Sequence, residues 1–303
     1  VIGGNGFIGS HLVDELASRG HDVVVFDRFS ADERRYLAPT ATRIVGDFLN
    51  RADVRSALDG IDLVFHMLST TTPATAERDP TLDVRTNVLA SIALFELAAD
   101  AGVKRVYFGS TGGAIYGEHD VEVMSEDLAA RPISPYAIGK LAIEGYLRYF
   151  ARTTQLPAVS LRISNPYGPR QGRNKRQGVI PIFLNEIAAG RPITVLGDGS
   201  MVRDFIEVAD VARMMADMAD VELHHDVYNL GSGHGTTVNE VVTVIREVTG
   251  REVVVEHRPK PPTFLDRVVL DTTRYQREFG TPDLTPLSDG IARTWTELTG
   301  ARE

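Results

Sequence analysis

The sequence has 303 residues, of which 43% are hydrophobic and 24% are charged, as in an ordinary globular protein. Its 32 basic and 41 acidic residues give a net charge of -9 without any stripe of Lys or Arg, so we expect no nucleic-acid partner. The absence of cysteine excludes disulfides, thiolate catalysis and cysteine-ligated metals. No apolar stretch approaches the ~20 residues of a membrane span, and we expect a cytoplasmic protein that does not bind membranes.

The first half of the chain alternates short apolar runs with amphipathic segments. Residues 1–3 resemble the end of a strand, so we expect no signal peptide and a few further residues before Val1 that complete the strand. Buried strands are predicted at residues 22–27, 42–47, 62–68, 104–109 and 158–164, and helices at 10–19, 51–58, 81–101 and 135–153. This alternation predicts an α/β protein with a parallel, doubly wound sheet.

The pattern of alternating strands and helices ends after residue 165, where a polar loop rich in Gly, Pro and Arg begins. The later predicted elements are a helix at 179–189, a strand at 192–199, an apolar segment at 205–220, a strand at 226–233, a helix at 237–248, a basic strand and loop at 251–263, and a helix at 287–298. We therefore expect two lobes. The first lobe covers residues 1–165, and the chain returns to it at about residues 205–230. The second is a smaller α/β lobe formed by the remainder of residues 166–303.

The stretch GGNGFIG places Gly3, Gly6 and Gly9 between a strand and a helix. Glycines at this spacing permit a tight turn and close approach of the backbone to a pyrophosphate, which would lie at the helix amino end formed by Phe7 and Ile8. The motif predicts a Rossmann-type dinucleotide site in the first lobe.

The next strand ends in Asp27, 18 residues after Gly9. A carboxylate there can accept hydrogen bonds from the adenosine ribose and would repel a 2′-phosphate, which favours NAD over NADP. Arg28 weakens that preference, and a plain turn or cap is the alternative role for Asp27. Further along the same sheet edge, the third and fourth strands are followed by Asp47 and Phe48 and by Met67, Leu68 and Ser69. These residues are predicted either to line the cofactor, with Asp47 near the adenine amino group, or to be ordinary loop and core residues.

The stretch SPYAIGK places Tyr136 and Lys140 four residues apart on one helix, hence on the same face. A tyrosine has a pKa near ~10, and a neighbouring cation would lower it by stabilising the phenolate. Such a pair can act as acid and base towards an alcohol, although Tyr and Lys also meet on helices by chance.

Two hydroxyl residues, Ser110 and Thr111, follow the predicted strand at 104–109 and precede two glycines. They are ordinary turn residues on one interpretation. If the strand belongs to a parallel sheet, its carboxyl end is where such sheets bind ligands, and a hydroxyl there can face a substrate.

Together these motifs resemble the extended short-chain dehydrogenase/reductase family, and within it the nucleotide-sugar epimerases of the UDP-glucose/UDP-galactose 4-epimerase type. The resemblance runs through GGNGFIGSHL, GDF, VFHML, TNV, YFGSTGGAIYGE, SPYAIGK, LRISNPYGPRQ, ITVLGDGSMVRDFIEVADVA and YNLGSG. It implies an isomerase that holds NAD tightly, contacts it also through Asn87, and binds a nucleotide diphosphate sugar, most often a UDP-sugar. Tyr136 and Lys140 would be the catalytic pair.

The resemblance also implies substrate residues in the second lobe. It suggests Asn165 for the sugar or its phosphate, Arg203 for the diphosphate, and backbone near Val179, Ile180 and Val195 for the base. The family usually has a second arginine for the diphosphate shortly before a Gly-Asp pair. No residue here matches it clearly, which leaves Arg258, Lys260 and Arg267 as candidates.

The sequence departs from its relatives beside the hydroxyls. The family's dehydratases carry an acidic residue after the catalytic hydroxyl, where this chain has Gly112 and Gly113, so elimination of water is disfavoured. In many relatives the catalytic hydroxyl lies four residues before the tyrosine of the closing YG, and that position is Gly112. Thr111 stands one residue earlier and Ser110 two; we favour Thr111.

The primary interpretation is an NAD-dependent 4-epimerase, in which C4 of the sugar is oxidised and then reduced on its other face. One alternative is a nucleotide-sugar 4-ketoreductase of the same family, and another is a non-catalytic NAD-binding regulator. The helices at 81–101 and 135–153 carry apolar residues on more than one face, which suggests a homodimer, although packing on the sheet explains part of this. The eight histidines show no metal-binding spacing, and no metal is expected.

Overall fold

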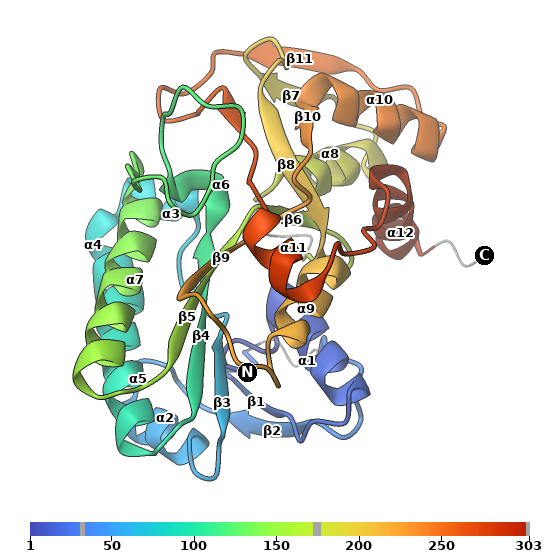
Figure 1. Ribbon diagram of the computed structural model, residues 1–303. Helices are drawn as coiled ribbons and strands as arrows, with labels where there is room; N and C mark the ends of the chain where they lie inside the picture. The colour runs from blue at the N-terminus through green and yellow to red at the C-terminus, as the bar shows by residue number, and fades with distance from the viewer. Residues whose placement is uncertain (31–33, 172–176, 301–303) are drawn as a thin grey trace.

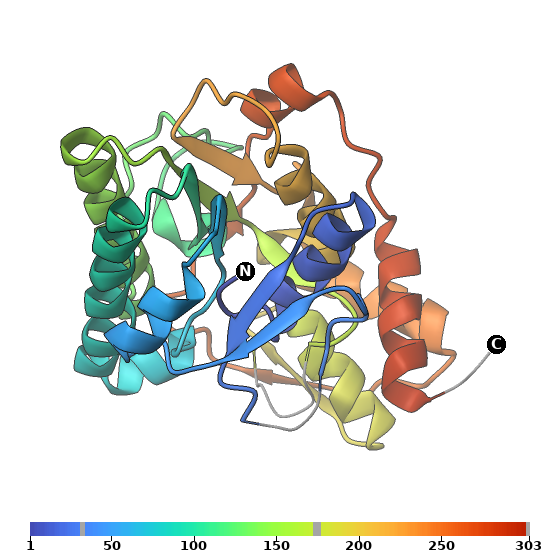
Figure 2. The ribbon, with the colours of Figure 1, turned by 90° about the horizontal axis from the view of Figure 1, so that it is seen from below.

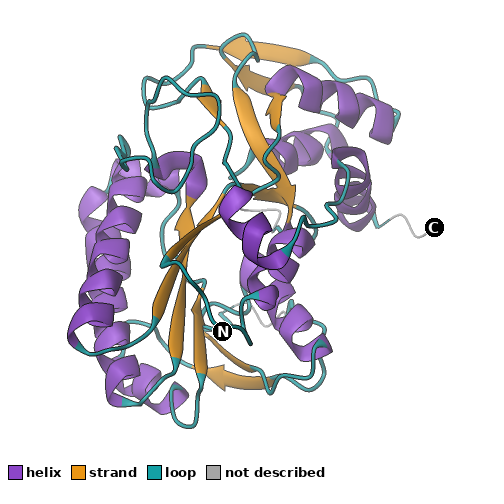
Figure 3. Ribbon diagram, in the orientation of Figure 1, coloured by secondary structure: helices purple, strands orange, loops and turns teal. Residues whose placement is uncertain are grey.

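The computed structural model describes residues 1–30, 34–171 and 177–300 (Figure 1). Part of the predicted polar loop after residue 165, residues 172–176, lies outside the described residues. Figure 3 shows the strands of the large sheet with helices on either side of them.

The larger sheet is wholly parallel. Its strands are β1 (Val24–Asp27), β2 (Thr42–Val45), β3 (Leu63–His66), β4 (Arg105–Thr111), β5 (Ala158–Ile163) and β9 (Val227–Leu230). Ile2 forms parallel bridges to Phe26 of β1 and His66 of β3, so the order across the sheet is β2, β1, Ile2, β3, β4, β5, β9. The order reverses around the first residues of the chain, which confirms the predicted doubly wound α/β sheet.

Helices cover both faces of this sheet (Figures 1 and 2). One face carries α2 (Arg51–Ala57), α5 (Leu89–Asp100) and α7 (Pro135–Thr153), and the other carries α1 (Phe7–Ser18), α9 (Val208–Asp217) and α11 (Thr273–Phe279). The strands therefore bury both sides, which explains why they appear in the sequence as continuous apolar runs rather than as alternating patterns.

The single helix predicted at 81–101 is interrupted. It consists of α4 (Pro80–Asp83), a π-helical turn η1 (Val84–Val88) and α5, and a further short helix, α3 (Pro73–Arg78), precedes it. A π-turn often marks a functional position. Here Asp83 directly precedes the turn and Asn87 lies within it, and both polar residues are buried.

The second lobe, as far as its residues are described, contains two small sheets and three helices. In one sheet, β8 (Val202–Glu207) pairs with β6 (Asn165–Tyr167), β10 (Gly235–Thr237) and β12 (Arg267–Val268). In the other, β7 (Ile193–Leu196) pairs with β11 (Val255–Arg258). The helices are α8 (Val179–Ala188), α10 (Val238–Thr249) and α12 (Leu287–Thr299), and they enclose a separate apolar core. After β8 the chain returns through α9 and β9 to the large sheet.

Candidate functional site

The glycine loop lies at the carboxyl edge of the large sheet, directly before α1. Gly3 has φ +77°, and a Cβ atom there would lie 2.8 Å from the Cα atom of Leu68. A Cβ atom at Gly9 would lie 2.3 Å from the Gly3 carbonyl oxygen. The loop is closed by the Gly6 N–H, which donates to the same oxygen at 2.9 Å. Only glycine fits these positions, and the backbone is left bare towards any ligand.

The amino end of α1 has the properties of an anion site. Gly6 is its N-cap, no described side chain caps the helix, and no acidic residue lies in its first turn, which begins with Phe7 and Ile8. The uncapped N–H groups and the positive end of the helix dipole favour a phosphate. The loop and helix therefore fit the pyrophosphate of a dinucleotide.

Asp27 ends β1 beside this loop and is half-buried. Its carboxylate accepts the Asn5 N–H at 3.1 Å and the Arg28 N–H at 2.8 Å, one on each oxygen. A carboxylate offers about four acceptor positions, so two remain for ribose hydroxyls. The Arg28 guanidinium is turned to Asp47, 2.7 Å away, and lies on an exposed surface.

The other predicted cofactor residues along this edge differ in which of their atoms a ligand can reach. The Phe48 ring is buried against His66, with ring centroids 5.0 Å apart, so only its backbone can face a ligand. Leu68 packs its backbone on Gly3, Met67 lies beside Gly109, and the Ser69 hydroxyl donates to the Thr71 carbonyl at 2.9 Å.

Tyr136 and Lys140 lie on α7, whose amino end is capped by the Ser134 side chain. Lys140 Nζ donates a hydrogen bond to the Gly109 carbonyl at 2.7 Å. The same nitrogen is 5.8 Å from the Tyr136 ring centroid and 4.7 Å from that of Phe108. The hydrogen bond to Gly109 fixes Lys140, and with it this face of α7, against the carboxyl end of β4.

The electrostatics of the pair differ from the expectation. Burial, followed by the negative charge of Asp83, raises the pKa of Tyr136 to about 12. Burial lowers the pKa of Lys140 to about 8, against the opposing effects of Asp83 and Glu144. In the protein alone the pKa of Tyr136 is therefore above its ordinary value, and a lowering by Lys140 stays a prediction.

Ser110 and Thr111 point their hydroxyls in different directions. Ser110 Oγ is buried and donates to Glu144 Oε1 at 2.6 Å. Glu144 in turn accepts two hydrogen bonds from Arg162, at 3.1 and 2.8 Å, within the core. Thr111 is half-buried and is the N-cap of α6 (Gly112–Ile115), but its side chain makes no capping bond. A ligand can therefore reach the Thr111 hydroxyl more readily than that of Ser110.

The two glycines after Thr111 have different surroundings. A Cβ atom at Gly112 would lie 2.5 Å from Leu270 Cδ1 and 2.9 Å from the Arg162 carbonyl oxygen, so this position has no room for a side chain. A Cβ atom at Gly113 would lie 3.3 Å from Asn165 Oδ1. Packing therefore restricts Gly112 more strongly than Gly113.

Buried polar residues lie around Tyr136 and Lys140. The sequence analysis did not connect them to this pair. Asn87 Oδ1 accepts from the Thr70 N–H at 2.9 Å, and its Nδ2 donates to Asp83 at 2.8 Å, so its side chain is held inside the protein. Their spacing in the sequence could have indicated Asp83 and Glu144. Asp83 lies four residues before Asn87, and Glu144 lies four residues after Lys140. No pattern indicated that Asp83 faces α7.

The predicted substrate residues occupy the second lobe. Asn165 Nδ2 donates to the Asp204 carbonyl at 3.1 Å, close to Gly113. The Arg203 guanidinium donates to the Val202 and Leu265 carbonyls, and burial lowers its pKa. Val179 begins α8, whereas the side chains of Ile180 and Val195 are in the core, which leaves only their backbone for a base.

The basic residues of the tail do not converge on Arg203. In the parallel pairing of β12 with β8, Arg267 lies opposite Val202 and Val268 opposite Arg203. Because paired residues share a face, Arg267 and Arg203 leave opposite faces of this sheet. Lys260 pairs with Asp266, and Arg258 is exposed at the end of β11.

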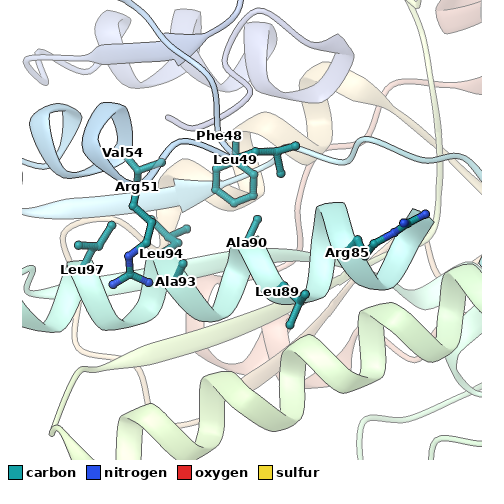
Figure 4. A pocket seen from close by; sticks show the side chains of 10 residues that line it. All are labelled: Phe48, Leu49, Arg51, Val54, Arg85, Leu89, Ala90, Ala93, Leu94 and Leu97. Atoms are coloured by element: carbon teal, nitrogen blue, oxygen red, sulfur yellow. The ribbon is translucent and has the colours of Figure 1, made fainter. Parts of the chain in front are cut away.

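A separate cavity of about 270 Å³ lies between α2 and α5 (Figure 4). It is lined mainly by apolar side chains of α5, with Phe48 and Leu49 above them, and neither Tyr136, Lys140 nor the glycine loop contributes. Within the described ranges, no helix is long and apolar enough to cross a membrane. No cluster of metal-binding side chains is found among the same residues.

Residues 1–231 match the family described as the NAD dependent epimerase/dehydratase family. The chain is 33% identical to a UDP-glucose 4-epimerase of Mycolicibacterium smegmatis, with 97% of this chain and 96% of the relative covered. It is 31% identical to a dTDP-4-dehydro-6-deoxyglucose reductase of Escherichia coli, at 96% and 94% coverage. Among solved structures, the Thermus thermophilus UDP-glucose 4-epimerase in complex with NAD has a TM-score of 0.91 and 34% identity, with 99% and 98% covered.

The family match covers most of the chain, and its cofactor agrees with the bare glycine loop, the uncapped helix end and Asp27. The chain belongs to the NAD dependent epimerase/dehydratase family, and NAD is its cofactor.

Proposed function

We propose that this protein is a nucleotide-sugar 4-epimerase that acts on a UDP-sugar. The observation that carries the proposal is the position of Lys140 at the carboxyl edge of the sheet, where it binds the Gly109 carbonyl two residues before Thr111 and one helical turn after Tyr136. No acidic side chain follows Thr111, because the next two residues are Gly112 and Gly113. An oxidation that is later reversed needs one acid/base group, whereas loss of water needs a further acid and base.

In this proposal the first lobe is the cofactor domain, and the second lobe binds the substrate. Gly3, Gly6 and Gly9 with the start of α1 hold the pyrophosphate, Asp27 the ribose, and Asp47 with the Phe48 backbone the adenine. Met67, Leu68, Ser69, Asn87 and Ser110 shape the edge along which the cofactor lies. The bound cofactor supplies reversible acceptance of a hydride.

The remaining chemistry belongs to side chains of this chain. Tyr136 removes the proton of the sugar C4 hydroxyl and later returns a proton to the same oxygen. Lys140, held by Gly109, provides the positive charge that makes this exchange feasible, and Thr111 hydrogen-bonds the reacting oxygen. Substrate and product then have the same oxidation level.

The second lobe positions the substrate. Arg203 would bind the diphosphate, Asn165 the sugar side of the cleft, and the backbone near Val179 and Val195 the base. Arg267 would need to move across its sheet to join Arg203, so we assign it a weaker role. A fixed diphosphate lets the sugar turn over without leaving the site.

The test is a panel of UDP, GDP and TDP sugars with product separation, applied to the wild type, Tyr136→Phe and Tyr146→Phe. Tyr146 lies exposed on the same helix and serves as the matched control. We expect one sugar pair to interconvert without net NADH change, a loss of roughly 10²-fold or more in Tyr136→Phe, and little change in Tyr146→Phe. Unchanged turnover in Tyr136→Phe would contradict the proposal.

A second candidate is a nucleotide-sugar 4-ketoreductase, because one relative is a dTDP-4-dehydro-6-deoxyglucose reductase. Such an enzyme exchanges its cofactor and consumes free NADH with a 4-keto sugar, whereas the epimerase keeps its NAD. A non-catalytic NAD-binding regulator is the third candidate and would show neither activity. Bound NAD and NADH consumption of the purified protein separate the reductase from the other two candidates. Interconversion of sugars in the panel above then separates the epimerase from the regulator.

We also propose a cytoplasmic homodimer. Large apolar side chains are exposed along the outer faces of η1, α5 and α7: Val84, Leu89, Ile138, Tyr146 and Tyr149. These helices lie side by side on one flank of the molecule (Figure 1). Two copies of this flank would bury each other's apolar surface.

A further inference from the structure

Asp83 is a buried carboxylate next to the catalytic pair, with 3% of its surface exposed. It is the last residue of α4, where the chain enters the π-turn. Its Oδ1 accepts hydrogen bonds from Thr71 Oγ1 and from Asn87 Nδ2. Among the residues that the structure describes, no donor reaches Oδ2. A buried carboxylate is costly unless another charge balances it.

The second oxygen of Asp83 points at α7. A Cβ atom at Gly139 would lie 2.0 Å from Oδ2, so the carboxylate occupies the space that a side chain would need. Gly139 lies between Tyr136 and Lys140 on the helix, three residues after one and directly before the other. The glycine in the YAIGK stretch therefore admits a negative charge between the two members of the pair.

We propose that Asp83 is a positioning residue of the site: its carboxylate balances the Lys140 ammonium and keeps Tyr136 a neutral phenol until cofactor and substrate are bound. The inference deepens the proposed function and rests on it only for the assignment of the acid/base roles. Asp83 acts through its charge on the two side chains and does not touch the substrate.

Few other charged side chains lie near Tyr136, Lys140 and Asp83 among the described residues. Lys140 is also near Glu144 on its own helix and near the buried His66 of β3. Glu144 is already paired with Arg162 of β5, which leaves Asp83, within the described part of the chain, as the unpaired negative charge beside Lys140. The charged residues of α3 and α5 that flank α7, including Glu77, Arg78 and Glu96, lie towards the exposed side.

The sign of the effect follows from these positions. A negative charge favours the charged form of lysine and the neutral form of tyrosine, so Asp83 raises the pKa of both groups. Replacing it by an uncharged residue lowers both pKa values. The ionisations of the pair then move to lower pH, by about one unit for a charge within ~4–6 Å.

The lysine side of this effect can be measured directly, because the chain has only four lysines: Lys104, Lys140, Lys175 and Lys260. Isotope-labelled lysine side chains in the purified protein give four NMR signals, and loss of one in Lys140→Arg assigns Lys140. We expect Asp83→Asn to titrate Lys140 about one unit below the wild type. Asp100→Asn removes an equal charge from an exposed position at the end of α5 and should leave the titration unchanged.

The activity profile tests the same charge in the working enzyme. In Asp83→Asn the acid and basic limbs of kcat against pH should both move to lower pH by about one unit, with KM for the nucleotide sugar nearly unchanged. A uniform drop in kcat without a shift, together with an unchanged Lys140 titration, would show a merely structural role and overturn the proposal.

Two further points keep the test decisive. If Asp83→Asn does not fold, Asp83→Ser removes the charge with a smaller side chain that still hydrogen-bonds Asn87. If the wild type converts no sugar, the proposed function fails, but the NMR titration still decides whether Asp83 sets the charge of Lys140.

Discussion

Ser110 and Thr111 are neighbours in sequence but have different surroundings. The Ser110 hydroxyl belongs to the buried network of Glu144 and Arg162, while the Thr111 hydroxyl has no intramolecular bond among the described residues. A strand alternates its side chains between two faces, and these are the last two residues of β4, so the two hydroxyls leave the strand on opposite faces.

This difference predicts opposite outcomes for two single substitutions. Thr111→Val should lower kcat by roughly 10- to 100-fold with little change in stability, since it removes one hydrogen bond to the reacting oxygen. Ser110→Ala should keep most activity and lose about 1 kcal/mol of stability, because Glu144 retains Arg162. Steady-state kinetics and urea unfolding check both. An inactive but stable Ser110→Ala beside a fully active Thr111→Val would reverse the assignment.

At the scale of the element, α7 carries two glycines with different surroundings. A Cβ atom at Gly139 would overlap the Asp83 carboxylate, whereas no described atom lies within 4 Å of one at Gly145. The helix therefore contains one glycine required by packing and another that only weakens it.

Replacing each glycine by alanine separates the two effects. Gly145→Ala should raise the free energy of unfolding by about 0.5–1 kcal/mol, because alanine is the better helix former. Gly139→Ala should lower it by about 1–3 kcal/mol, because Asp83 or the helix must move. Urea unfolding of both variants provides the measurement. Equal stabilisation by the two alanines would mean that Asp83 does not lie against α7.

Most elements of the first lobe could be predicted, and so could the three helices and the strands β7 and β11 of the second lobe. The strands β6, β8, β10 and β12 could not, for a physical reason. Strands such as β4 are buried on both faces and appear as apolar runs, and Gly3, Gly6 and Gly9 form a motif with one geometric meaning. By contrast, β8 reads VRDFIE and β10 reads GTT, so neither shows an apolar pattern. Strands without such a pattern are defined by their neighbours rather than by their own residues.

The site shows the same limit. Tyr136 and Lys140 could be found because four residues on a helix define one face. Asp83 could not, because its contact with Gly139 joins two helices more than fifty residues apart in the chain. Sequence spacing also could not show that Arg203 and Arg267 leave opposite faces of one sheet.

At the scale of the whole molecule, the exposed apolar flank of α5 and α7 is the feature that needs explanation. Tyr149 is 57% exposed and Ile138 52% exposed, three turns apart on the outer face of α7. Soluble surfaces rarely gather large apolar side chains in this way unless a partner covers them.

The proposed dimer gives a direct prediction. The double substitution Ile138→Arg and Tyr149→Arg should convert the protein to monomers in sedimentation velocity, because two buried charges per subunit would face the partner. Val254→Arg changes an equally exposed apolar residue before β11 in the second lobe and should leave the dimer intact. A wild type that sediments as a monomer would refute the dimer outright.

The core of the first lobe is completed by residues near the other end of the chain. The Tyr275 hydroxyl of α11 donates to Asp217 at 2.6 Å, and the Tyr228 hydroxyl of β9 donates to Glu278 at 2.7 Å. During synthesis on the ribosome, the nucleotide-binding half must therefore wait for about 280 residues before its last helix can dock. Until β9 has been made, β5 presents an open edge with which other strands could pair.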